Sequence, residues 1–128
     1  MSDANIDSYI KANEPFFTGE SVQTLLAALY EKRSISKAAL ARRSGISEVY
    51  LHQVFSGRRT PSRNRLLCLC IGLEATLDET QRLLKQATYA QLYPKAKRDA
   101  IICHGIVHKT ALQQINDKLF AENQKTLL

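Results

Sequence analysis

Apolar residues recur every three or four positions along most of the chain, which is the spacing of one face of an α-helix. The strict alternation typical of β-strands is not found over any useful length. The pattern therefore predicts an all-α fold that begins with five helices, at about 20–33, 36–43, 47–56, 62–73 and 78–87. Residues 1–18 are interpreted as a short helix or an arm packed by its aromatic residues, because Pro15 interrupts their helical spacing.

Two further helices are predicted at about 95–107 and 111–119, beyond an aromatic linker at 88–94. This pair could not be stable in isolation, since short helices need tertiary packing of an apolar face. It must pack on the first five helices, on another copy of the chain, or on a partner protein. The expected organisation is an arm at 1–18, a five-helix domain at 19–88 and a C-terminal helical extension at 89–128.

The charge of the chain is concentrated in one segment. Residues 30–65 hold nine basic and two acidic residues, a net charge of +7, whereas residues 1–29 carry −3 and residues 66–128 carry +2. A local positive field favours a polyanionic partner, although a solvated basic surface is the alternative interpretation. No apolar run reaches the roughly 18 residues of a membrane span, and the acidic N-terminus does not resemble a signal peptide. We therefore expect a cytoplasmic protein that does not enter a membrane.

The basic segment surrounds a pattern of two short helices joined by a glycine turn. Ser36 and Ser47 stand where helix N-caps are expected, and Gly45 stands where a left-handed residue ends the first of the two helices. Gly57 ends the second helix, and the basic loop Arg58-Arg59-Thr60-Pro61 follows. The arrangement predicts a helix-turn-helix that offers one exposed helix to a DNA groove and arginines to phosphates.

Residues 35–79 resemble the Cro/C1 (XRE-type) helix-turn-helix family, which includes the lambdoid phage repressors. The resemblance is carried by Leu40-Ala41, Gly45-Ile46-Ser47, Leu51 with Val54, the loop from Ser56 to Pro61, the apolar run from Leu66 to Leu73, and Thr76-Leu77-Asp78-Glu79. It implies a five-helix lambda-repressor-like domain that binds double-stranded DNA. Two positions depart from the family pattern: Lys37 replaces a frequent glutamine that anchors a phosphate, and Phe55 replaces a frequent glutamate.

The resemblance also implies the roles of individual residues. Glu48, Val49 and Gln53 would face base edges, where these side chains suit cytosine, the thymine methyl group and adenine respectively. Tyr50 and His52 flank them, but packing for Tyr50 and a solvated surface position for His52 are equally open. The residues expected at the DNA backbone are Ser36, Lys37, Ser47, Ser56, Arg58, Arg59 and Arg63, which Arg65 could extend. For Ser36 and Ser47, helix capping explains the residue as well as DNA binding does.

The remaining chemistry of the chain predicts no enzyme, cofactor or metal site. Cys68 and Cys70 are two residues apart on one helix, so their thiols diverge, whereas His104 and His108 share a face. No glycine loop for phosphates and no acid–base constellation accompanies them. We expect a sequence-specific transcription regulator that binds DNA as a homodimer, with an α-helix at about 47–56 in the major groove. The alternative is an antitoxin-like or adaptor-like interaction protein whose residues 95–120 bind another protein.

Overall fold

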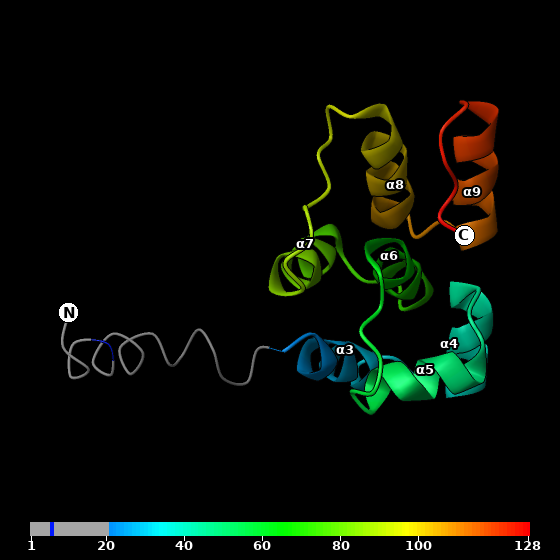
Figure 1. Cartoon of the computed structure of the whole chain (residues 1–128). Helices are drawn as coiled ribbons and strands as arrows, with labels where there is room; N and C mark the ends of the chain where they lie inside the picture. Colours follow the sequence, from blue (N-terminus) through cyan, green and yellow to red (C-terminus); the bar gives the residue numbers. More distant parts are fainter. Residues whose placement is uncertain (1–5, 7–20) are drawn as a thin grey trace.

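The computed structural model describes Ile6 and residues 21–128, and the described residues are helical without any strand (Figure 1). The all-α expectation is confirmed, and within residues 21–128 five helices are followed by two more as the periodicity predicted. They are α3 (Val22–Glu31), α4 (Lys37–Ser44), α5 (Glu48–Phe55), α6 (Arg63–Gly72), α7 (Leu77–Gln86), α8 (Lys97–Val107) and α9 (Leu112–Ala121). The arm predicted at 1–18 lies outside the described residues except for Ile6. Among the described helices, none has the length and apolar character needed to cross a bilayer.

Side-chain caps fix where the first five of these helices begin. Each cap oxygen accepts a hydrogen bond from the backbone N–H three residues later, which satisfies one of the orphan donors of the first turn. At Thr76 the cap is reciprocal, because the Glu79 carboxylate accepts the Thr76 N–H at 2.8 Å. The caps are Ser21, Ser36, Ser47, Ser62 and Thr76.

Helix α6 lies at the centre of the molecule. Every residue from Leu66 to Gly72 is buried, so the helix has no solvent face over that stretch. It contacts α4, α7, α8 and α9, and Figure 1 shows it between the α3, α4 and α5 group and the α8 and α9 pair. Gly72 allows α4 to approach closely, since a Cβ at this position would collide with Ser44 Oγ.

The C-terminal helices belong to the same core as the first five. Ile102 and Leu119 are fully buried in one apolar cluster with the side chains of α6, which confirms the first of the three packing arrangements left open by the sequence. The linker between α7 and α8 is fixed to α7, because the Gln81 side chain donates to Leu92 O at 2.9 Å and accepts the Leu92 N–H at 2.7 Å.

The segment after α9 returns to the helix-turn-helix. Leu127 is buried, and its N–H donates to Asn116 Oδ1 at 2.7 Å. At Gly45, whose φ is +65°, a Cβ would lie 2.5 Å from Leu128 Cδ1 and 3.2 Å from Leu112 Cδ2. The turn between α4 and α5 therefore touches the C-terminal layer directly.

Ser44 generates a prediction on stability. Its hydroxyl is fully buried between α4 and α6 and has no hydrogen-bond partner among the described residues. A buried hydroxyl without a partner costs about 1–3 kcal/mol of desolvation. We expect Ser44→Ala to raise the free energy of unfolding by about 1 kcal/mol, measured by urea denaturation.

The matched control is Ser62→Ala, which removes the cap of α6 and should lower the same free energy by about 1 kcal/mol. A loss of stability in Ser44→Ala would show that the hydroxyl contributes a favourable contact, contrary to this account.

Candidate nucleic-acid interface

Helix α5 is covered on one side only. Its residues Leu51 and Val54 are buried against the core, whereas its opposite face is open and includes Val49, which is 68% exposed. The turn before α5 is closed by Gly45 in the left-handed conformation, as the sequence predicted. Val49, the second residue of the helix, therefore faces solvent on this open side.

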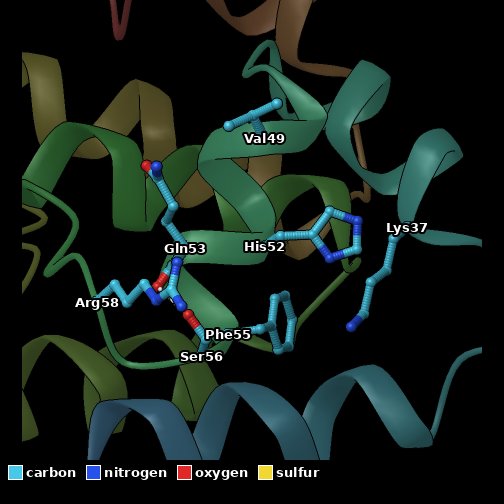
Figure 2. A pocket seen from close by; sticks show the side chains of 7 residues that line it. All are labelled: Lys37, Val49, His52, Gln53, Phe55, Ser56 and Arg58. Atoms are coloured by element: carbon cyan, nitrogen blue, oxygen red, sulfur yellow. Dashed lines mark hydrogen bonds between the residues drawn. The ribbon is translucent and has the colours of Figure 1, made fainter.

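A shallow groove of about 510 Å³ runs along the open face of α5 (Figure 2). Lys37 and His52 lie on one side of it, and Gln53 and Arg58 lie on the other. The residues that line it are Lys37, Val49, His52, Gln53, Phe55, Ser56 and Arg58. All seven are residues that the sequence either assigned to DNA or identified as a departure from the family pattern.

The basic loop after α5 is fixed to the end of that helix. The N–H groups of Arg58 and Arg59 both donate to Gln53 O, at 2.9 and 3.2 Å. Gly57 has a φ of +82°, which lets the backbone turn sharply where α5 ends. Gln23 of α3 also holds the end of α5, because its Nε2 donates to Phe55 O at 2.8 Å. Neither arginine side chain forms an ion pair within the described part of the chain. Arg58 therefore brings to the groove a positive charge that no acidic side chain of the described residues pairs, whereas Arg59 lines a neighbouring pocket with Gln23 of α3.

The two departures from the family pattern are in contact with each other. Lys37 Nζ lies 5.3 Å from the centroid of the Phe55 ring and 5.9 Å from that of Tyr30. The two rings pack edge to face with centroids 5.4 Å apart. Lysine and phenylalanine thus form one cation–aromatic pair at the edge of α5, a pairing that glutamine and glutamate would not make.

The three serines assigned to the DNA backbone have roles within the fold. Ser36 Oγ accepts the Ala39 N–H at 3.1 Å, and Ser47 Oγ accepts the Tyr50 N–H at 3.0 Å. Ser56 Oγ donates to Gln53 O at 3.1 Å. The capping interpretation is confirmed for Ser36 and Ser47. At the start of α5, Glu48 Oε1 lies 3.7 Å from His52 Nε2, so these two exposed side chains are neighbours.

Arg63 does not lie at this face, although the sequence assigned it to the DNA backbone. Its Nε donates to Ala90 O at 2.9 Å, and a terminal nitrogen lies 3.3 Å from Asp99 Oδ2. The same carboxylate oxygen accepts the Tyr93 N–H at 2.9 Å. The Arg63 guanidinium therefore links α6 to the linker and to α8. Arg65 instead approaches α5, with Cζ 4.5 Å from the centroid of the Tyr50 ring.

The cysteines and histidines do not form a metal cluster. Within residues 21–128, no three His, Cys, Asp or Glu side chains are placed to share an ion. Burial raises the pKa of Cys68 to about 11 and that of Cys70 to about 12, so both remain protonated thiols at neutral pH. The His104 and His108 rings stack on α8 with centroids 4.1 Å apart.

Residues 24–83 match the family model of a helix-turn-helix domain, which covers α4, the glycine turn, α5, α6 and most of α3 and α7. No curated protein and no solved structure matches the chain. The chain therefore carries a helix-turn-helix domain, the class of domain typical of DNA-binding regulators.

The position of Arg63 generates a second prediction. Removing a guanidinium that bonds two carbonyls and a half-buried carboxylate leaves those acceptors unpaired. We expect Arg63→Gln to lower the free energy of unfolding by about 1.5–3 kcal/mol, measured by urea denaturation. The exposed Arg59→Gln serves as the matched control and should change it by less than about 0.5 kcal/mol. Equal denaturation midpoints for the two variants would contradict a structural role for Arg63.

Proposed function

We propose that this protein is a sequence-specific transcription regulator that places α5 in the major groove of double-stranded DNA and has no enzymatic activity. The proposal is carried by one observation: the open face of α5 is bordered by cations that form no ion pair within the described residues. Such a border suits a helix placed between two phosphate backbones. The family match supports the same reading, and the protein would act in the cytoplasm where it meets DNA.

The open face supplies side chains for reading bases. Gln53 can form two hydrogen bonds to adenine, Glu48 can accept one from cytosine N4, and the exposed Val49 can contact a thymine methyl group. Outside them, Lys37, Arg58 and Arg59 would contact phosphates, and such contacts fix orientation without reading sequence. The carboxylate of Glu48 repels phosphates, so affinity for unrelated DNA is reduced relative to the cognate site.

A homodimer is part of this proposal. Helix α5 has eight residues and spans about 12 Å, so a single copy reads only a few base pairs. Two copies on a pseudo-palindromic site would double the contacts and set half-sites about one helical turn apart. The half-site spacing would follow from the dimer geometry.

A second candidate is a protein-binding module that uses residues 95–120. It is favoured by a groove of about 460 Å³ between α8 and α9, whose apolar floor includes Ile101, Gly105 and Ile115. Phe120 on α9 is 78% exposed. Exposed aromatic side chains are enriched in protein interfaces.

Selection from a random duplex DNA pool tests the first candidate. We expect the parent protein to enrich a two-fold motif at moderate salt, whereas Gln53→Ala combined with Arg58→Gln enriches none. The variant loses one base contact and one phosphate contact, and it leaves the core intact because Arg58 is exposed and Gln53 is only partly buried.

The matched control combines Gln113→Ala with Lys118→Gln on α9, both exposed and distant in sequence from the groove, and it should enrich the same motif as the parent. Weak, salt-sensitive binding by the parent with no enriched motif would overturn the regulator proposal and favour the protein-binding module.

A further inference from the structure

We propose that Arg65, held on the ring of Tyr50, contacts the DNA backbone on one flank of α5, while Lys37, held on the ring of Phe55, contacts the backbone on the other flank. This inference rests on the proposed DNA-binding function and names the residues that straddle the groove-facing helix. Each pair brings together segments well separated along the chain: α6 with α5 in the first, and α4 with α5 in the second.

The two aromatic rings lie on opposite flanks of the open face. Tyr50 and Phe55 are five residues apart on a helix that turns 100° per residue, so they are about 140° apart across its covered side and about 220° apart across its open side. Both rings are partly buried against the core, and the exposed Val49 and His52 project between them. A cation over each ring therefore lies at one edge of the exposed surface.

Arg65 is available for a ligand, in contrast with Arg63 two residues earlier. Residues two positions apart on a helix point about 200° away from each other, so the two guanidinium groups leave α6 in different directions. Arg63 is saturated by carbonyls and Asp99, whereas the exposed Arg65 forms no ion pair within the described residues. The first turn of α6 contains no acidic residue that could neutralise it.

The aromatic contact positions the cation without consuming its donors. A guanidinium carries five N–H donors in its own plane, and attraction to the face of a ring occupies none of them. The donors remain free for the planar, two-point contact that arginine makes with phosphate. Holding the long side chain at the ring also reduces the rotamer entropy that is lost when DNA binds. Tyr50 is accordingly a positioning residue, and Arg65 is the contact.

The dimensions of DNA account for one such cation on each flank. The major groove is about 12 Å wide, so a helix lying in it has a phosphate backbone on either side. Arg65 and Lys37 would meet opposite strands, whereas Arg58 and Arg59 follow the end of α5. The arrangement fixes the rotation of α5 about its own axis, which decides whether Gln53 or His52 faces the bases.

Salt-dependent binding to the selected duplex tests this inference. Each phosphate contact contributes about 0.9 to the slope of log affinity against log salt. We expect Arg65→Gln to reduce the slope by about 0.9 per protein copy, so between 50 and 200 mM salt the parent loses about 3.5-fold more affinity per copy than the variant. The reduction should be equal on unrelated duplexes, because phosphate contacts carry no sequence information. Arg63→Gln, folded at the assay temperature, should keep the parent slope.

Substitutions at Tyr50 separate positioning from contact. Tyr50→Phe keeps the ring and should keep the parent affinity and slope, whereas Tyr50→Leu should reproduce the loss seen with Arg65→Gln. A scan of neutral methylphosphonate linkages should show one backbone position that weakens the parent but not Arg65→Gln, and a position on the opposite strand that behaves the same way with Lys37→Gln.

The outcomes distinguish this inference from the function on which it rests. A parent that binds no duplex overturns the DNA-binding function itself. A parent that binds, with an unchanged slope in Arg65→Gln, overturns the role of Arg65 alone. Equal losses in Tyr50→Phe and Tyr50→Leu, in proteins with parental thermal stability, overturn the positioning role of the ring.

Discussion

The complete burial of α6 is the constraint on which the rest of the structure depends. A helix that is apolar on every side from Leu66 to Gly72 must be enclosed by neighbours, and α4, α7, α8 and α9 enclose it. Helix α5 is not among these close neighbours, and it rests on α3 and α4 instead. The helix that carries the groove is therefore peripheral, and its principal helix contacts are with α3 and α4.

The same helix decides which arginines serve the fold and which face outward. Arg63 bonds the linker and α8, because the burial of α6 brings Asp99 and two linker carbonyls close to the first turn of α6. Arg65 leaves the helix on the other side and meets Tyr50. Enclosing α6 thus removes one positive charge from the surface and leaves the other beside α5.

The sequence predicted what local rules control and missed what depends on long-range contacts. The seven helices of residues 21–128, the serine caps and the glycine turn follow from periodicity and capping chemistry within a few residues. The open face of α5 followed from the same periodicity, with Leu51 and Val54 on the covered side. The roles of Arg63 and Arg65 could not be separated, since their partners lie 15 to 36 residues away in sequence. The contact between Lys37 and Phe55 gave no periodic signal either, and each appeared only as an isolated departure.

The contact of Leu112 and Leu128 with Gly45 makes the helix-turn-helix a poor candidate for transplantation. The angle between α4 and α5 is set at a turn that has leucines from the C-terminal layer packed against it. A graft of residues 36–56 onto another scaffold would lack this support and would present α5 at an angle determined by the new host. The orientation of α5 is consequently a property of the entire helical assembly, and substitutions at positions 112 or 128 would alter it.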